Sequence, residues 1–271
     1  MKKLLLVNPV GRKSGYLLSK FSTVPPLSLA YIAALTPADW EVTLADENFG
    51  PMVYEDADLV GISAFTSNIN RAYEIARIYR ERKTKVVIGG IHASVLPEEV
   101  LRYCDAVVIG EAEGIWHKVL EDWEHHRLGG KYHGPMIDLS KDAIKPRRDL
   151  IDNRYFFYSI QTSRGCPFDC DFCTVSKYLG RAFRQRTAQD VLEELREVNS
   201  RYVFFIDDNL LGHSSQSRKR ARDIFRGMIH LNLKKRWWMQ TSVDSVEDFE
   251  TIKLAGRSGC MFAFIGFEAI D

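Results

Sequence analysis

Three of the five cysteines in this 271-residue chain lie within eight positions of one another. They are Cys166, Cys170 and Cys173 in the segment TSRGCPFDCDFCTV, and Gly165 and Pro167 flank the first of them. Disulfide pairing explains them poorly, because three is an odd number and neighbours this close would strain a bond. Clustered thiolates are suited to holding a metal or an iron-sulfur cluster. We therefore predict a metal centre in this segment.

The number of ligands separates two kinds of metal centre. Structural zinc sites use four protein ligands, and no histidine lies inside the cysteine segment to complete such a set. His213 is the nearest histidine downstream, and nothing in its spacing favours zinc. A cluster of four irons can be held by three cysteines, which leaves one iron open to a small molecule. We therefore predict a 4Fe-4S cluster, and a zinc knuckle is the alternative.

Charge and hydropathy narrow the class of protein. The chain contains 37 basic and 36 acidic residues, so no excess of positive charge points to a nucleic-acid partner. The apolar run in MKKLLLVNPV stops at Asn8 and Pro9, too early for a signal peptide, and no later run approaches a membrane span. We expect a cytoplasmic protein without a transmembrane segment, because thiols stay reduced in the cytosol.

Alternating segments in the first half predict a doubly wound α/β domain. Five short apolar runs are typical of buried parallel strands, at residues 4–9, 41–46, 59–65, 85–91 and 106–112. Other segments have apolar residues at helical spacing, at residues 25–37, 68–83, 97–104 and 114–126. Together they predict a Rossmann-like parallel sheet over residues 1–127. Residues 128–154 carry glycines, prolines and mixed charge without periodicity, and we interpret them as a linker.

Residues 155–271 repeat a pattern of strand followed by helix. The predicted strands are 155–163, 202–209, 236–244 and 261–271, and the first of them leads directly into the cysteines. One helix is predicted to begin after Thr187 as its N-cap, and two others lie near 216–231 and 246–259. This pattern predicts a partial (β/α) barrel, a fold in which chemistry collects at the carboxyl ends of the strands.

The segment CPFDCDFC, placed after a strand in a βα series, resembles the signature of the radical S-adenosylmethionine (radical SAM) superfamily. The resemblance implies that Cys166, Cys170 and Cys173 ligate a 4Fe-4S cluster, with Phe172 at the aromatic position before the last cysteine. It also implies that the open iron binds S-adenosylmethionine (SAM), which one electron cleaves to a 5'-deoxyadenosyl radical. The cofactors carry out this step, while the protein orients them and excludes water.

Other strand ends resemble the superfamily less closely. Many members have a Gly-Gly-Glu motif after the second barrel strand, where this chain reads FIDDN. Its polar residues would offer oxygens to the methionine ammonium, and capping of the next helix is the alternative. The segment IGFEA after the fourth strand resembles the family ending Gly-Phe-Glu. The contacts with SAM predicted from strand ends are Asp207, Asp208, Asn209, Gln240, Gly266 and Glu268.

The first half resembles the cobalamin-binding domain that precedes many radical SAM domains. The likeness lies in VGISAFTSNINRAYEIARIYR and VVIGGIHASVLPEEVLRYCDAVVIGEAE. It implies that small residues at strand ends let the backbone approach a bulky nucleotide tail. The residues in these places are Ser63, Gly89, Gly90, Gly110 and Glu111. Tight turns alone are one alternative explanation for the glycines, because any doubly wound domain needs such turns at these places. Another alternative is a domain that keeps this fold without the cofactor, because such relatives exist.

The place where many cobalamin domains carry a cobalt-binding histidine reads NPVGRKSG in this chain, without a histidine. We therefore expect cobalamin to bind without a histidine as its lower ligand. His92, in GGIHAS, is expected to be a pocket residue at most.

Together the resemblances imply a radical SAM enzyme that uses cobalamin. The expected reaction is C-methylation of an unactivated carbon in a small molecule, lipid or natural-product intermediate, with flavodoxin or ferredoxin as the reductant. One alternative is ring formation or rearrangement without methyl transfer, and another is a cluster-bearing electron carrier or redox sensor. The family barrel has about six βα units, fewer than the eight of a full barrel, and this sequence supplies about four, so we expect a C-terminally truncated chain.

Overall fold

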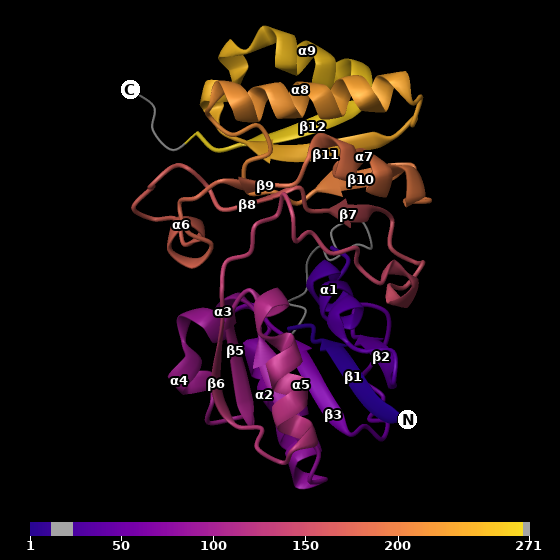
Figure 1. Cartoon of the computed structure of the whole chain (residues 1–271), viewed down its shortest axis with the longest axis vertical. Coiled ribbons are helices and arrows are strands. Elements are labelled where there is room, and N and C mark those ends of the chain that lie inside the picture. The colour runs from indigo at the N-terminus through magenta and orange to yellow at the C-terminus, as the bar shows by residue number, and fades with distance from the viewer. Residues whose placement is uncertain (12–23, 268–271) are drawn as a thin grey trace. The chain divides into compact units, whose positions relative to one another are not determined.

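The computed structural model describes residues 1–11 and 24–267 and divides the chain into two compact units (Figure 1). The N-terminal unit consists of Met1–Ile137 and Ile144–Arg154. The C-terminal unit consists of Asp138–Ala143 and Tyr155–Asp271. Each unit buries apolar side chains of its own, so each is described by itself.

The described residues of the N-terminal unit form a parallel sheet of six strands in the order β2-β1-β3-β4-β5-β6. The strands are β1 (Lys2–Asn8), β2 (Trp40–Asp46), β3 (Leu59–Ser63), β4 (Lys85–Gly89), β5 (Ala106–Gly110) and β6 (Gly130–Gly134). The chain proceeds outward from β1 in both directions, which is the doubly wound arrangement. Ligands of such sheets bind beyond the carboxyl ends of the strands, where the direction of winding changes. In this unit the change lies between β1 and β3.

Strand β6 lies inside residues 128–154, which the sequence analysis interpreted as a linker. It pairs in parallel with β5, from Ala106 opposite Gly130 to Gly110 opposite Gly134. Its sequence, GKYHG, contains one large apolar residue, the buried Tyr132. An edge strand pairs with a neighbour on one side only, so it lacks the continuous apolar run of a central strand. The predictions of five strands and of a linker over these residues were therefore wrong.

Helices cover both faces of this sheet. They are α1 (Leu27–Leu35), α2 (Ile69–Glu81), α3 (Ile91–Val95), α4 (Pro97–Val100) and α5 (Trp116–Glu124), with the short 3-10 helices η1 (Ala112–Gly114) and η2 (Arg148–Leu150). Side chains of α2, α3 and α4 share one buried cluster with the sheet, while those of α1 and α5 share another. In α2 the apolar face predicted from helical spacing is fully buried, as Ala72, Ile75, Ala76 and Tyr79 show.

Four of the described strands of the C-terminal unit form a second parallel sheet in the order β12-β11-β10-β7. They are β7 (Tyr158–Ile160), β10 (Tyr202–Phe205), β11 (Arg236–Thr241) and β12 (Cys260–Ile265). The helices α7 (Ala188–Glu197), α8 (Ser215–His230) and α9 (Phe249–Ser258) connect successive strands, and η3 (Val243–Glu247) precedes α9. Side chains of all three helices share one buried cluster with the sheet. Neighbouring strands that follow chain order, with helices on one face, form the wall of a βα barrel, as predicted.

Alternation of side chains along these strands gives the second sheet two different faces. Trp237 and Met239 of β11 are buried on the face that the helices cover. Trp238, between them, lies on the opposite face, where it stacks on Phe204 with ring centroids 5.7 Å apart. Trp237 and Met239 therefore belong to the core of this unit.

Hydrogen bonds fix where the helices of this unit begin. The side chain of Thr187 accepts a hydrogen bond from the backbone N–H of Asp190, which confirms Thr187 as the N-cap of α7. Ser214 and Ser217 form a reciprocal capping box at the start of α8. Over residues 1–11 and 24–267, no helix has both the length and the apolar character needed to cross a membrane.

Candidate functional site

The three clustered cysteines lie on a loop that two short strands close. Strand β8 (Ser163–Arg164) pairs antiparallel with β9 (Arg184–Gln185), so the segment 165–183 leaves and returns at the same place. The sequence analysis predicted one strand over 155–163, whereas β7 ends at Ile160 and the chain turns before β8. We call residues 165–183 the cysteine loop. It also contains the one-turn helix α6 (Val175–Tyr178).

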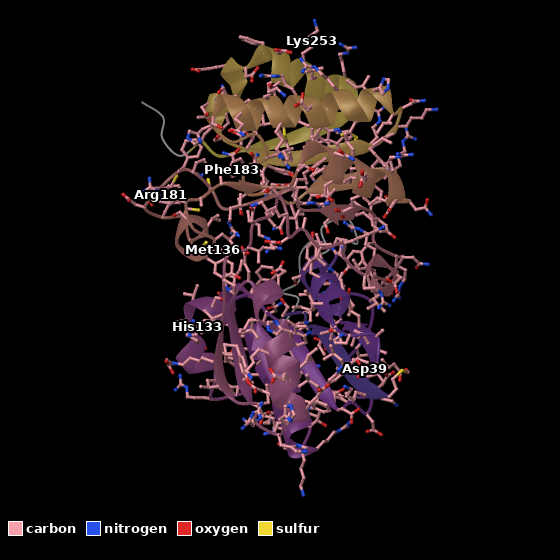
Figure 2. The ribbon with its side chains drawn as sticks, viewed as in Figure 1. Asp39, His133, Met136, Arg181, Phe183 and Lys253 are labelled. Carbon is pink, nitrogen blue, oxygen red and sulfur yellow. The ribbon has the colours of Figure 1, made fainter. Side chains whose placement is uncertain are left out.

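The base of the cysteine loop is packed too tightly for a side chain at Gly165. Its φ is +85°, and a Cβ atom there would lie 2.4 Å from the carbonyl oxygen of Ala182. Arg181, which projects from the loop (Figure 2), pairs with Asp169 at 3.2 Å. Phe183 lies against Gly212, where an added Cβ would be 2.5 Å from the ring. These contacts bring the two ends of the loop together and anchor the loop to the segment after β10.

The three cysteines of the loop form no disulfide with one another and are partly accessible. Cys166, Cys170 and Cys173 are all free and partly exposed. The backbone N–H of Cys173 donates to the carbonyl oxygen of Cys170 at 3.0 Å, which makes a turn between the last two. Burial raises the pKa of Cys166, and the charges of Asp208, Cys173 and Cys170 add to the effect. Both other thiols therefore lie within electrostatic reach of Cys166.

This donor set fits an iron-sulfur cluster better than a single metal ion. Among the described residues, no three His, Cys, Asp or Glu side chains are arranged to hold one metal ion. A four-iron cluster makes a different demand, because each cysteine binds its own iron atom. His213 lies beside the loop, with its ring centroid 6.0 Å from that of Phe168, and it belongs to no such group. Free thiols gathered on one loop are the ligands that a cluster requires.

The polar residues after β10 have different surroundings. Asp207 is completely buried, and its Oδ1 accepts hydrogen bonds from the backbone and hydroxyl of Thr162 and from the hydroxyl of Ser163. Asn209 is also buried; its side chain donates to Ser242 at 3.0 Å and accepts from the backbone of Gly212 at 3.1 Å. Both side chains thus form hydrogen bonds with protein groups, and their contact with SAM stays a prediction. The helix-capping alternative fails, since α8 begins after Ser214.

Asp208 is the member of this trio that is open to a ligand. Its side chain is exposed, while partial desolvation and then the neighbouring Asp207 raise its pKa to about 6. Its negative charge contributes to the raised pKa of Cys166. A carboxylate open to solvent beside the cysteine loop can accept hydrogen bonds from the ammonium group of a bound molecule.

The remaining residues predicted to contact SAM differ from one another in exposure and in hydrogen bonding. Phe172 is 67% exposed between the last two cysteines, so its ring is available to a ligand. The side chain of Gln240 donates to the backbone carbonyl of Asp207 at 3.3 Å, which commits it to joining β11 to the end of β10. Gly266 follows the end of β12, and Glu268 lies outside the described residues.

In the N-terminal unit, the predicted cofactor residues bring backbone segments together. Gly90 has φ +97°, and a Cβ there would lie 2.7 Å from the carbonyl oxygen of Ala64. The N–H of Ala64 donates to the carbonyl of Gly89 at 3.1 Å, which joins the ends of β3 and β4. The hydroxyls of Ser63 and Ser28 are 3.3 Å apart, which brings the start of α1 to the same place. These residues lie beside the change of winding between β1 and β3.

Gly110 and Glu111 hold the next strand end. The backbone N–H of Gly110 donates to the hydroxyl of Ser94 at 3.0 Å. The buried carboxylate of Glu111 accepts from the backbone N–H of Ile137 at 2.9 Å. Glu111 therefore anchors the segment after β6.

His92 is enclosed by protein groups. Its side chain is buried, its Nδ1 lies 3.0 Å from the hydroxyl of Thr66, and its Nε2 lies 3.5 Å from a carboxylate oxygen of Glu99. The hydroxyl of Tyr73 donates to the same oxygen of Glu99 at 2.9 Å. The imidazole thus has polar protein neighbours on both ring nitrogens.

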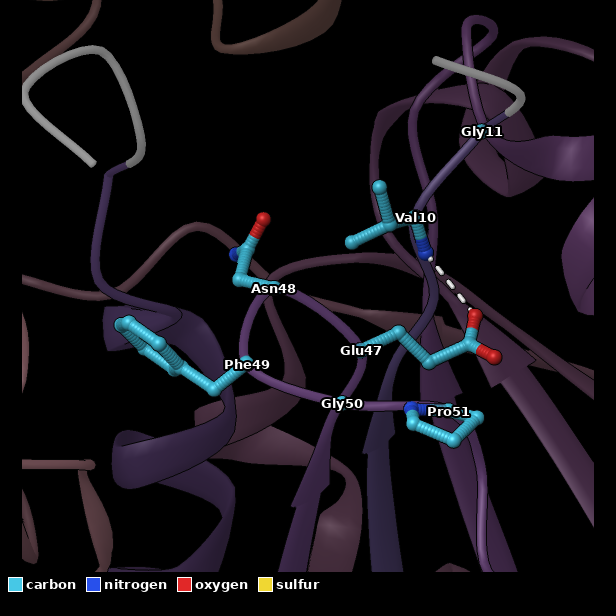
Figure 3. A pocket seen from close by; sticks show the side chains of 7 residues that line it. All are labelled: Val10, Gly11, Glu47, Asn48, Phe49, Gly50 and Pro51. Atoms are coloured by element: carbon cyan, nitrogen blue, oxygen red, sulfur yellow. Dashed lines mark hydrogen bonds between the residues drawn. The ribbon is translucent and has the colours of Figure 1, made fainter. Parts of the chain in front are cut away.

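The sequence analysis missed a cavity of about 520 Å³ at the ends of β1 and β2. Its lining residues are Val10, Gly11, Glu47, Asn48, Phe49, Gly50 and Pro51 (Figure 3). The carboxylate of Glu47 accepts from the backbone of Val10 at 3.1 Å and pairs with Arg71. The polar segment ENFGP after β2 is the only signal in the sequence that could have pointed to it.

Comparison with known proteins finds one matching domain model and several related sequences. The model of the B12 binding domain matches residues 14–120. Two proteins of Chlorobaculum tepidum are similar, namely bacteriochlorophyllide d C-8(2)-methyltransferase (29% identity) and C-12(1)-methyltransferase (30% identity). The alignments cover 90% and 100% of this chain and 57% and 61% of those proteins. The chain thus spans about three fifths of the length of these curated relatives.

Solved structures share the fold. The cobalamin-dependent S-adenosylmethionine radical enzyme OxsB superposes with a TM-score of 0.78 at 18% identity, over 99% of this chain and 44% of that one. The radical S-adenosylmethionine methyltransferase TsrM of Kitasatospora setae gives a TM-score of 0.78 at 19% identity, over 100% and 60%. The matched domain model, the related sequences and the solved structures agree with one another: the chain is similar to radical SAM proteins that carry an N-terminal B12-binding domain.

Proposed function

We propose that the protein binds a 4Fe-4S cluster, SAM and cobalamin, and transfers a methyl group to an unactivated carbon of a small molecule or lipid. The observation that carries this proposal is the cysteine loop, which gathers three free thiols beside the exposed carboxylate of Asp208. Thiolates and a carboxylate in this combination suit a cluster and the ammonium end of SAM.

The residues of the C-terminal unit divide the binding between them. Cys166, Cys170 and Cys173 hold the cluster, while Asp208 accepts hydrogen bonds from the ammonium of SAM. Phe172 offers an exposed ring beside the last cysteine. When bound, the cluster and SAM supply a radical that removes a hydrogen atom, and cobalamin supplies the methyl group. The electron comes from a reductant such as flavodoxin or ferredoxin.

In the N-terminal unit, cobalamin binds beyond the carboxyl ends of β3, β4 and β5. Ser63, Gly89, Gly90 and Gly110 are the residues proposed to receive it, together with the backbone that Glu111 anchors. Small residues beside a change of winding support this, because they let the backbone approach a bulky ligand closely. The match of the B12 binding domain to residues 14–120 supports it independently.

Methyl transfer to carbon is favoured by the relatives. Besides the two bacteriochlorophyllide methyltransferases, hopanoid C-3 methylase of Methylococcus capsulatus is 26% identical over 93% of this chain. The test is turnover with methyl-labelled SAM under a strong reductant, using the complete protein and a candidate acceptor. Methyl transfer requires label in the product and the release of both S-adenosylhomocysteine and 5'-deoxyadenosine. Turnover that is undiminished without cobalamin would contradict it.

Ring formation is the second candidate, and one relative favours it. Anaerobic magnesium-protoporphyrin IX monomethyl ester cyclase of Rubrivivax gelatinosus is 26% identical over 78% of this chain. The same labelled experiment separates the two reactions, because a cyclised product would carry no label from SAM.

A further inference from the structure

The residue that holds the entrance to the cysteine loop is Asp207. It follows β10 and is 0% exposed, although its neighbour Asp208 is exposed. A carboxylate buried so completely must be compensated by hydrogen bonds or by an opposite charge. Asp207 has hydrogen-bond donors and an opposite charge nearby. These groups all belong to or contact the few residues that lead into Cys166.

One oxygen of Asp207 accepts every hydrogen bond that the carboxylate makes among the described residues. Oδ1 lies 3.0 Å from the backbone nitrogen of Thr162, 3.0 Å from its hydroxyl, and within hydrogen-bond distance of the Ser163 hydroxyl. Oδ2 is buried without a partner among those residues. The carboxylate is therefore directed at Thr162 and Ser163, which lie four and three residues before Cys166.

The other side of the same peptide segment is held by arginines. Arg220 of α8 donates to the carbonyl oxygens of Thr162 and Arg186, and the backbone N–H of Arg186 donates to Thr162 as well. Arg186 itself forms a buried ion pair with Glu194 of α7. Thr162 is thus hydrogen-bonded at its N–H, its hydroxyl and its carbonyl. Side chains of α8 and, through Arg186, of α7 contribute to these contacts.

Charge strengthens this arrangement. Burial lowers the pKa of Arg220 to about 10, which leaves the guanidinium charged at neutral pH. Its attraction to Asp207 opposes the rise in the pKa of that carboxyl group caused by burial. The two opposite charges therefore compensate each other across the Thr162 backbone.

We infer that Asp207 is a positioning residue for the cluster: it fixes Thr162 and Ser163, and through them the place of Cys166 at the start of the loop. This rests on the proposed function, in which Cys166 is a cluster ligand. From Thr162 the chain passes through β8 to Gly165, whose backbone meets Ala182 at the far end of the loop. Little freedom remains between the carboxylate and the first cysteine. Residues that orient ligands in this way affect metal retention without touching the metal.

The experiment compares Asp207→Ala with Asp207→Asn after anaerobic reconstitution with iron and sulfide. Asparagine keeps an acceptor oxygen for Thr162 and Ser163, whereas alanine removes it. We expect the alanine variant to lose iron to a chelator roughly tenfold faster and to show an altered electron paramagnetic resonance line shape for the reduced cluster. The asparagine variant should lie between the alanine variant and the unmodified protein in both properties, because it keeps the acceptor oxygen but loses the charge that compensates Arg220. Asp223→Asn, which changes a partly exposed carboxylate on α8, is the control and should match the unmodified protein.

The variant Ser163→Ala provides a second test of the positioning role. If Asp207→Ala does not fold, Ser163→Ala removes a single donor and should give a smaller change of the same kind. Cluster retention and line shape unchanged in both Asp207→Ala and Ser163→Ala would overturn the positioning role and leave the proposed function standing. Failure of the unmodified protein to take up any cluster would overturn the proposed function, and this inference with it.

Discussion

The strand ends of the two units present different chemical groups. In the N-terminal unit, the ends of β3 and β4 meet through backbone atoms, with Gly90 at a positive φ beside Ala64. In the C-terminal unit, the end of β10 carries ionisable side chains, and Asp207 and Asp208 stand next to each other with one buried and one exposed. A strand end formed by backbone atoms can approach a large ligand closely, whereas carboxylates bind positively charged groups and hold neighbouring loops by hydrogen bonds.

This contrast matches the ligands proposed for each unit. Cobalamin is large, so a site for it must first make room, and small residues do so. SAM is compact and charged, and its site must present groups of opposite charge at fixed positions. The comparison therefore predicts two kinds of effect. Substitutions in the N-terminal unit should change steric fit and backbone conformation, whereas those in the C-terminal unit should remove a cluster ligand or a charged group.

The largest effect is expected at the cysteines. Replacing Cys166, Cys170 or Cys173 by Ala removes one of three cluster ligands, so each variant should lose the broad absorbance at roughly 400 nm of a thiolate-ligated cluster. Visible absorption and iron content after reconstitution measure this loss. Cys260→Ala is the control, because that thiol packs against the core of the same unit. Equal loss of colour in the control would refute the ligand assignment.

A smaller effect is expected at Gly90, where the change is one of space. Gly90→Ala places a Cβ 2.7 Å from the Ala64 carbonyl at φ +97°, so the free energy of unfolding of the N-terminal unit should fall by about 1–3 kcal/mol. Urea unfolding followed by circular dichroism measures the change. Gly50→Ala is the matched control, since an added Cβ there meets nothing within 4 Å. If both variants unfold alike, the close approach at Gly90 does not matter.

The chemical side of the comparison is tested at Asp208. Asp208→Asn removes the charge but keeps the shape, so the KM for SAM should rise about tenfold, in line with the loss of one charge-assisted hydrogen bond. The formation of 5'-deoxyadenosine as a function of SAM concentration measures this KM. Iron content should stay the same, which separates Asp208 from Asp207. An unchanged KM would remove Asp208 from the proposed site.

The smallest effect is expected at His92. Its ring nitrogens face Thr66 and Glu99, so His92→Gln should leave the electron paramagnetic resonance spectrum of bound cob(II)alamin unaltered. In the unmodified protein that spectrum should lack nitrogen splitting from a protein imidazole. Splitting that is present and disappears in His92→Gln would show that the imidazole binds cobalt.

Patterns along the sequence predicted most of the central elements, because buried strands and amphipathic helices are marked by local apolar spacing. Thr187 was recognisable as an N-cap for the same reason, since its hydrogen bond to Asp190 spans three residues. What escaped prediction depends on contacts distant in sequence. β6 is stabilised by pairing with β5, and β8 exists because residues 163 and 164 meet residues 184 and 185.

The candidate site shows the same limit within three consecutive residues. Spacing predicted that the cysteines are ligands and that Asp207, Asp208 and Asn209 form a polar group at a strand end. It could not distinguish between them, because the partners of Asp207 lie 44 and 45 positions away and those of Asn209 include a residue 33 positions away. Burial separates the three, and burial is a property of the folded chain.

The division of the chain between the units has a consequence for its synthesis. Residues 144–154 belong to the N-terminal unit, where the N–H of Arg147 donates to Ala30 and the guanidinium of Arg154 lies 4.4 Å from the ring centre of Phe49. A ribosome that has completed β6 at residue 134 must therefore add about 20 residues before this unit can close. At about 5–20 residues per second, this takes roughly 1 to 4 s. During that interval the nascent sheet lacks the contacts that Arg147 makes with Ala30 and Arg154 makes with Phe49.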